Sequence, residues 1–175
     1  MSPLQYPTTL SAEDLVPAKK PRRSRSPSAP INRSALIDLL NEDLAREYQA
    51  IIAYVAYSQV IKGAAFMAIA KELEAHAKEE LEHALTISKQ IDYMGGTPTV
   101  TPKPVRMSHD SKALLRFDLE NERTTIGHYR TRVRQCEALG EYAMSEHIRE
   151  ILKQEQEHLI DLATALGEDA PDMTD

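Results

Sequence analysis

Apolar side chains recur at helical spacing over four long segments of the chain, which are separated by glycines or by a proline-rich loop. The segments run from 32 or 34 to 62, from 64 to 94, from 110 to 139 and from 141 to 166. Within each of them, leucine, isoleucine and tyrosine return every three or four residues, as on the buried face of an amphipathic helix. The pattern therefore predicts an all-α domain of four long helices.

The connection between the second and third predicted helices is long and contains Pro98, Pro102 and Pro104. When extended, its roughly 15 residues reach ~45–50 Å, which matches the ~42 Å length of a helix of about 28 residues. The other two connections are very short and make their helices antiparallel neighbours. We therefore expect a four-helix bundle with one long crossover, which makes the helices over 64–94 and 110–139 parallel.

Composition narrows the class of protein. The single cysteine, Cys136, excludes an internal disulfide framework and a cysteine-rich zinc or iron–sulfur site. No run of about 18 apolar residues exists, and no segment resembles a secretory signal. The length of 175 residues suits one domain with a full core. We expect one cytoplasmic domain with no membrane segment.

The N-terminal end of the chain is basic, whereas the predicted bundle over 32–167 is acidic. Residues 1–31 are basic and rich in proline, without apolar periodicity, and we interpret them as a disordered tail. Residues 168–175 form a short acidic tail. The basic groups within residues 19–33 suit nonspecific binding to DNA phosphates, or they simply keep this terminus soluble.

Each predicted helix carries one glutamate inside its apolar stripe. Two of these glutamates begin a Glu-x-x-His motif, in which the carboxylate and the imidazole lie on one helix face. The six residues are Glu47, Glu80, His83, Glu122, Glu155 and His158. Carboxylates in a dry core need a cation or another partner. Two divalent metal ions would neutralise the four carboxylates, and a Glu/His set without thiolate suits iron or manganese, while zinc is also compatible.

The spacing of these residues repeats along the chain. Glu47 and Glu80 lie 33 residues apart, and so do Glu122 and Glu155. Tyrosines follow Glu47 and Glu122 by seven residues, at positions 54 and 129. The repeat indicates two similar helix hairpins related by a pseudo-twofold axis, with all six candidate ligands at mid-height of the bundle.

Four segments of the chain resemble the ligand helices of the ferritin-like superfamily, and most closely those of bacterioferritin. They are LNEDLAREYQAIIAY, EELEHA, DLENERTTI and EQEHLIDL, and the resemblance covers about residues 34–166. It implies a ferritin-like four-helix bundle that holds two iron ions per chain, with manganese as the alternative metal. Glu47 and Glu122 would each be the terminal carboxylate of one iron. Glu80 and Glu155 would bridge the two irons, and His83 and His158 would cap one each.

The resemblance also implies an activity and an assembly. Tyr54 would be the site tyrosine, an electron donor close to the metals. The protein would be a ferroxidase that oxidises Fe²⁺ with O2 or peroxide, for iron storage, detoxification and protection against oxidative stress. It would form a homo-oligomeric shell.

The sequence departs from bacterioferritin in three places. Leu81 stands where bacterioferritin has its haem-binding methionine, so no haem is expected. The C-terminal tail is too short and polar for the fifth helix, which leaves the size of the shell open. The basic N-terminal arm resembles the cationic tails of the DNA-protecting mini-ferritins, the Dps proteins, and favours a Dps-like subgroup with a bacterioferritin-type site.

Two other functions stay open beside the ferroxidase. One is a di-manganese or di-iron enzyme that removes peroxide, of the catalase or peroxidase type. Rubrerythrin itself fits poorly, because the chain has no Cys-x-x-Cys pairs and has Thr125 where that family has an extra glutamate. The other is a Dps-like DNA-protecting protein that uses the basic N-terminal arm, which is compatible with iron oxidation in the same molecule.

Overall fold

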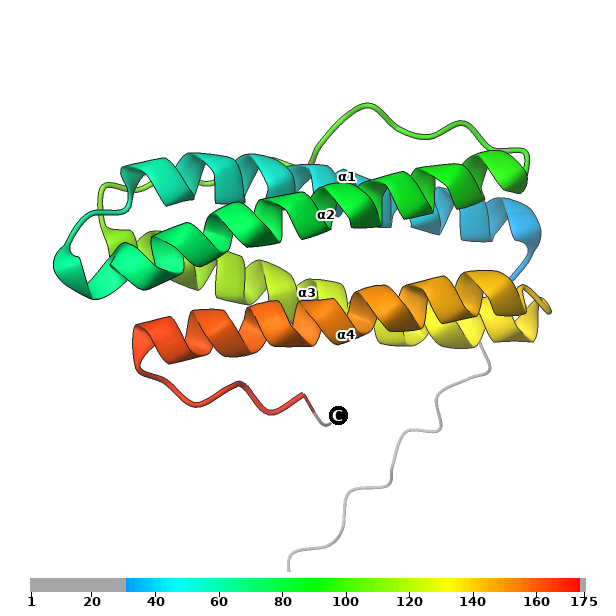
Figure 1. Ribbon diagram of the computed structural model, residues 1–175. Coiled ribbons are helices and arrows are strands. Elements are labelled where there is room, and N and C mark those ends of the chain that lie inside the picture. Colours follow the sequence, from blue (N-terminus) through cyan, green and yellow to red (C-terminus); the bar gives the residue numbers. More distant parts are fainter. Residues whose placement is uncertain (1–30, 174–175) are drawn as a thin grey trace, which may run out of the picture.

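Four long helices form a bundle in the computed structural model, which describes residues 31–173 (Figure 1). They are α1 (Arg33–Val60), α2 (Met67–Tyr93), α3 (Ser111–Ala138) and α4 (Tyr142–Leu166), with a short 3₁₀ turn, η2 (Ala64–Phe66), before α2. The described part of the chain contains no strand. The predicted all-α fold and its four helices are confirmed.

Helix ends follow from local side-chain and backbone chemistry. The side chain of Asn32 accepts a hydrogen bond from the amide of Ala35 and caps α1, as expected for this residue type. Helix α1 ends at Val60, two residues earlier than predicted, because the backbone of Ile61 is extended. Helix α2 begins three residues later than predicted, because Gly63 has φ 116° and the chain forms η2 before the α-helix starts.

The crossover loop between α2 and α3 runs alongside α1. The amide of Lys103 donates a hydrogen bond of 2.9 Å to the carbonyl of Ala45, and the hydroxyl of Tyr57 donates one to the carbonyl of Arg106. The loop therefore returns to the end of the bundle where α1 finishes, and α3 begins there. Helix α3 consequently runs parallel to α2, as the length of the loop predicted (Figure 1).

Apolar residues fill the two ends of the bundle interior and leave a polar layer between them. One cluster contains Leu36, Leu40 and Ile87, and the other contains Leu73, Leu115 and Leu162. Every helix contributes to both clusters, so their packing fixes the heights of the four helices relative to one another. The glutamates that interrupt the four apolar stripes are thereby brought to one level.

The chain ends lie partly outside the described residues. The predicted disordered tail over 1–31 and the DNA-binding segment over 19–33 fall mostly there, although Ile31 packs against the core and Arg33 begins α1. Residues 168–173 form no helix, and Glu168 pairs with Arg116 of α3 at 2.6 Å. Among residues 31–173, no helix is long and apolar enough to cross a membrane.

Candidate metal centre

All six predicted ligands lie in the polar layer and are at most 3% exposed. Their ligand atoms form two groups, in each of which the atoms lie within 4.8 Å of one another. One group is Glu47, Glu80, His83 and Glu155, and the other is Glu80, Glu122, Glu155 and His158. Two adjacent metal positions that share Glu80 and Glu155 can therefore be formed from one chain.

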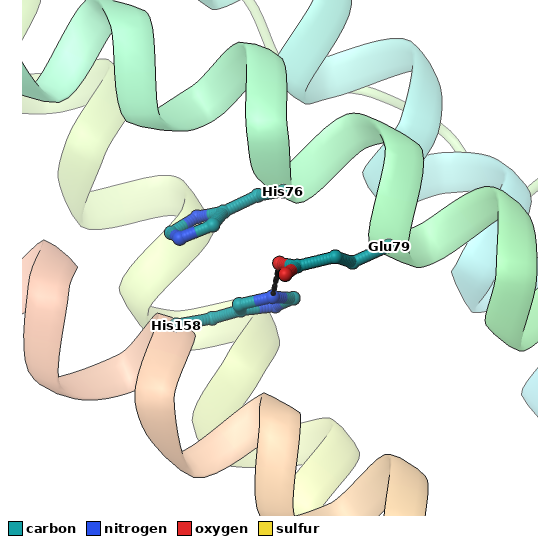
Figure 2. Close-up of side chains that lie close together, drawn as sticks. All are labelled: His76, Glu79 and His158. Atoms are coloured by element: carbon teal, nitrogen blue, oxygen red, sulfur yellow. Dashed lines mark hydrogen bonds and ion pairs between the residues drawn. The ribbon is translucent and has the colours of Figure 1, made fainter.

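The two imidazole rings are oriented alike. Nδ1 of His83 lies 3.2 Å from a carboxylate oxygen of Glu80, and Nδ1 of His158 lies 3.0 Å from the other oxygen of Glu80. The Nε2 atoms face away from these contacts: that of His83 lies 2.8 Å from Gln154 Oε1. That of His158 lies 2.9 Å from Glu79 Oε2 (Figure 2). Each ring thus offers Nδ1 to the centre and donates its Nε2–H outward.

Crowding of buried carboxylates changes their acid strength. Burial, and then the charge of Glu80, raises the pKa of Glu155 from 4.5 to about 7. Burial and neighbouring carboxylates likewise raise the pKa of Glu80 and Glu122. Burial opposes protonation of His158, but the adjacent carboxylate of Glu80 and the charges of other nearby carboxylates outweigh it and raise the pKa of His158 to about 9. Protons therefore neutralise the centre when no metal does.

Several oxygen and nitrogen atoms that could bind a metal ion in this layer have no hydrogen-bond partner in the described part of the chain. Oε1 of Glu80, Oε1 of Glu155 and Nδ1 of His158 are all buried and make no hydrogen bond, although Nδ1 of His158 and Oε1 of Glu80 lie 3.0 Å apart as an ion pair. A buried polar atom of this kind is costly unless a ligand satisfies it. Oxygen and nitrogen donors without sulfur suit iron or manganese. The residues present therefore fit a pair of such ions.

Two buried tyrosines hold the outer carboxylates of the centre. The hydroxyl of Tyr54 on α1 donates a hydrogen bond to Glu122 on α3, and that of Tyr129 on α3 donates one to Glu47 on α1. Tyr54 was expected near the centre, whereas Tyr129 was not chosen as a site residue. The signal for Tyr129 was present in the sequence, since both tyrosines follow a ligand glutamate by seven residues.

The amino-acid sequence is similar to that of known proteins. A sequence model described as Ferritin, ferritin-like domain, matches residues 37–170. The chain belongs to the ferritin-like family. Bacterioferritin of Brucella melitensis is 26% identical over 141 residues, which cover 77% of this chain and 88% of that protein. Bacterioferritin of Desulfovibrio desulfuricans is 25% identical over 134 residues, which cover 73% and 72%.

Solved structures of other members have the same fold. A ferritin-like di-iron-carboxylate protein of Bacillus anthracis superposes with a TM-score of 0.74 at 30% identity, over 77% of this chain and 96% of that one. The bacterioferritin-related protein of Bacteroides fragilis, described as a dodecameric thioferritin, gives a TM-score of 0.73 at 29% identity, over 79% and 88%. The resemblance to the ferritin-like superfamily and to bacterioferritin that the four ligand segments indicated is confirmed.

Further polar residues are buried around the centre of this ferritin-like bundle, and the sequence analysis did not assign them. His76 is 2% exposed and stacks on His158 with ring centroids 4.1 Å apart (Figure 2). Arg132 forms a buried ion pair with Asp43, with Nε 2.6 Å from Oδ2. Asp118 is also buried, but its Oδ2 has no hydrogen-bond partner within residues 31–173. The partners of these residues lie on other helices, which the local sequence of each residue does not indicate.

A pocket of about 310 Å³ connects the centre of the ferritin-like bundle to the surface. It lies between α1, α3 and the crossover loop, and all four ligand glutamates contribute to its lining. Arg46, Lys103 and Arg106 also line it. Lys103 pairs with Glu42, and Arg106 pairs with Glu120 at 2.8 Å, so two of the three cations are partly neutralised. Small solutes can reach the carboxylates by this route.

Proposed function

We propose that the protein is a ferroxidase that oxidises Fe²⁺ at a di-iron carboxylate centre within one chain, for iron storage or detoxification and protection against oxidative stress. The observation that carries this proposal is the pair of four-residue groups that share Glu80 and Glu155. Kinship to bacterioferritins supports the same activity. In this proposal Glu47 and Glu122 are terminal ligands, and His83 and His158 cap one iron each.

The chain's residues have distinct tasks in this reaction. Two Fe²⁺ ions are the substrate, and each gives up one electron; O2 takes two electrons and two protons to become peroxide, or peroxide takes them to become water. Glu80 and Glu155 hold the two ions together so that both electrons leave from one place. Tyr54 and Tyr129 fix the terminal carboxylates through hydrogen bonds. Binding of the ions releases the protons that the crowded carboxyls and His158 hold.

The test of the ferroxidase is a comparison of two variants on α4. Anaerobic protein is loaded with Fe²⁺, mixed with O2, and the formation of Fe³⁺ is followed by stopped-flow absorbance. The wild type should oxidise two Fe²⁺ per chain in a fast phase, and Glu155→Ala should lose that phase. Glu157→Ala removes an exposed carboxylate from the same helix and should retain it. An unchanged fast phase in Glu155→Ala would refute the proposed centre.

Storage also requires an assembly, and one face of the bundle supports it. Ile52 and Val55 of α1 and Leu81 and Leu85 of α2 are 45–56% exposed, although they are large and apolar. Val55 and Leu81 line one shallow pocket, so exposed apolar side chains of the two helices adjoin there. We infer that copies of the chain associate through it into a shell. Light scattering tests this, and a monomer that retains no iron would reject the storage function.

The same donor set supports a second candidate, a di-manganese enzyme that removes peroxide. Carboxylate and imidazole ligands without thiolate accept manganese as readily as iron. Metal analysis of protein purified without added metal separates the two candidates. Two manganese ions per chain with rapid disproportionation of peroxide would favour the enzyme, whereas iron that is oxidised and retained favours the ferroxidase.

A further inference from the structure

The two halves of the proposed centre repeat residue by residue. The candidate ligands and the two tyrosines of the first hairpin have identical counterparts 75 positions later in the second hairpin. The matched pairs are Glu47 and Glu122, Tyr54 and Tyr129, Glu80 and Glu155, and His83 and His158. The repeat fails beside the histidines, where His76 corresponds to Ile151 and Glu79, directly before a shared glutamate, corresponds to Gln154.

Glu79 and Gln154 occupy equivalent places in the structure. Glu79 Oε2 lies 2.9 Å from Nε2 of His158, and Gln154 Oε1 lies 2.8 Å from Nε2 of His83. Each accepts the proton of the ring nitrogen that faces away from the centre, which leaves Nδ1 free for a metal ion. The two contacts differ in charge, because one acceptor is a carboxylate and the other is a neutral amide.

An alternative interpretation of the Glu79 contact is a separate metal position. His76, Glu79 and His158 lie close enough together to hold an ion (Figure 2). His158 cannot serve both positions as a neutral ring, because its Nδ1 faces the shared carboxylates and its Nε2 must then carry the proton. Glu79 is therefore better explained as the acceptor that orients His158 than as a ligand itself.

A carboxylate behind a metal-bound histidine has a known physical effect. It fixes the ring and makes the imidazole more basic, and such outer partners change metal affinity by about 10–100-fold. The side chain of Glu79 is 42% exposed, so water screens part of its charge. We therefore expect the carboxylate of Glu79 to raise metal affinity by about tenfold more than the amide of Gln154 does, which is the lower end of that range.

The next residues outward differ between the halves in the same direction. Asp43 lies beside Arg132, which pairs with it at 2.6 Å, near the Glu47 end of the centre. The counterpart of Asp43, 75 positions later, is Asp118. The counterpart of Arg132, 75 positions earlier, is Tyr57. Asp118 thus has no arginine at the equivalent place, and one of its oxygens lacks a hydrogen bond within the described residues. Among the described residues, Asp118 therefore has no ion pair like the one that Asp43 forms with Arg132.

We propose that the two metal positions are unequal, and that Glu79 makes the position capped by His158 bind a divalent ion about tenfold more tightly than the position capped by His83. This inference rests on the di-metal centre proposed above. It assigns Glu79 and Gln154 as positioning residues. The tight position retains its ion, whereas the weak position, behind a neutral amide, exchanges it.

Co²⁺ alone, added without oxygen to the full-length metal-free protein, is the probe for this test. Calorimetry measures the affinity of each step, and anomalous diffraction from crystals loaded with one equivalent identifies the position that fills first. The variants are Glu79→Gln, Gln154→Glu and the double exchange of both. Exposed residues on the same helices provide the matched controls Glu82→Gln and Gln156→Glu.

The wild type and both controls should show two binding steps about tenfold apart, with cobalt first at His158. Gln154→Glu should strengthen the weak step about tenfold, and Glu79→Gln should weaken the tight step by a similar factor. The double exchange should restore two unequal steps and move the first cobalt to His83. Equal steps in the wild type, first filling at His83, or cobalt between His76 and Glu79 would overturn the inference. Absence of cobalt from both positions would overturn the di-metal centre as well, which distinguishes the two failures.

Discussion

The hydroxyl of Tyr54 on α1 donates a hydrogen bond to the carboxylate of Glu122 on α3, across the middle of the bundle. Tyr129 makes the reciprocal contact from α3 to Glu47 on α1. Both tyrosine side chains are fully buried. Each contact joins one hairpin to the other, so the terminal carboxylates are positioned by the opposite half of the bundle.

Replacement of either tyrosine by phenylalanine should destabilise the metal-free protein. A buried carboxylate oxygen loses its donor in each case, which costs roughly 1–3 kcal/mol. We expect Tyr54→Phe and Tyr129→Phe to lower the free energy of unfolding by similar amounts, as measured by urea denaturation. A loss in one variant alone would show that the two contacts do not have equal structural roles.

The two tyrosines should differ in redox behaviour. Both tyrosines belong to apolar clusters, but the ring of Tyr54 also packs edge-on against His76 and His158. An oxidised tyrosine must release its proton, and the polar surroundings of Tyr54 favour that release. If Tyr54 is the electron donor, a tyrosyl radical should form in the wild type and in Tyr129→Phe and be absent from Tyr54→Phe. Electron paramagnetic resonance after rapid freezing checks this, and a radical in Tyr54→Phe would assign the role elsewhere.

The stability of the metal-free protein should fall as the pH rises from 5 to 9. Glu155 has its pKa raised from 4.5 to about 7 in the folded state, so its stabilising contribution is complete below 4.5 and is lost as the pH rises through 7. His158 acts in the same direction, because its pKa is raised from 6.5 to about 9 and its contribution is lost between those values. We expect a fall in Tm of at least several degrees, since about 1 kcal/mol moves Tm by ~2–4 °C at this size.

Bound metal should remove this pH dependence over most of the range, because the cations replace the protons that neutralise the centre. Thermal unfolding with and without Mn²⁺ at pH 5, 7 and 9 measures the effect. Glu155→Gln is the informative control, since it carries no titrating proton and should flatten the curve below pH 7. A metal-free protein that becomes more stable toward pH 9 would contradict the assigned pKa directions.

The six candidate ligands stand out in the sequence because each is an exception to a strong pattern. Glu47 or Glu155 interrupts an otherwise apolar stripe, and helical periodicity alone puts it on the inner face. The crossover was also predictable, since a loop as long as the bundle can reach its opposite end and so allows a parallel α3. Local ends such as Ile61 were missed by two or three residues because they depend on backbone conformations that periodicity does not contain.

The surroundings of the centre were less predictable, because they depend on which inner faces meet. Asp43 and Arg132 lie 89 residues apart, and nothing in the local sequence of either indicates the other. His76 sits one turn before Glu80 on α2, yet its stacking on His158 of α4 arises only once the two hairpins dock. Tyr129 is the exception, since the internal repeat was sufficient to place it opposite Tyr54.

The buried pair of Asp43 and Arg132 provides a prediction about stability that is independent of metal. Arg132→Met leaves the carboxylate of Asp43 buried without its cation, which typically costs about 3–5 kcal/mol. The double variant Asp43→Leu, Arg132→Met removes both charges and should recover most of that loss. Urea denaturation of the metal-free proteins measures both. A double variant no more stable than Arg132→Met would show that the guanidinium contributes mainly through its hydrogen bonds to Gln135 and the carbonyl of Leu39.

Leu81 should serve association between chains. It is 49% exposed and lines the same shallow pocket as Val55 of α1. A lysine at this position would place a charge in the middle of the apolar face, and burying an unpaired charge there on association is strongly unfavourable. We therefore expect Leu81→Lys to reduce the assembly to a smaller species without loss of helical content.

Light scattering and circular dichroism of Leu81→Lys measure the size and the fold separately. Glu82→Lys is the matched control, because Glu82 is exposed on the neighbouring face of α2 and its replacement adds the same side chain outside the apolar surface. The control should assemble like the wild type. If Leu81→Lys also assembles normally, the face formed by Ile52, Val55, Leu81 and Leu85 is not the contact between chains. In the expected case, Leu81→Lys forms a smaller species that still oxidises Fe²⁺ rapidly. That result would separate oxidation, which needs one chain, from retention of iron, which needs the shell.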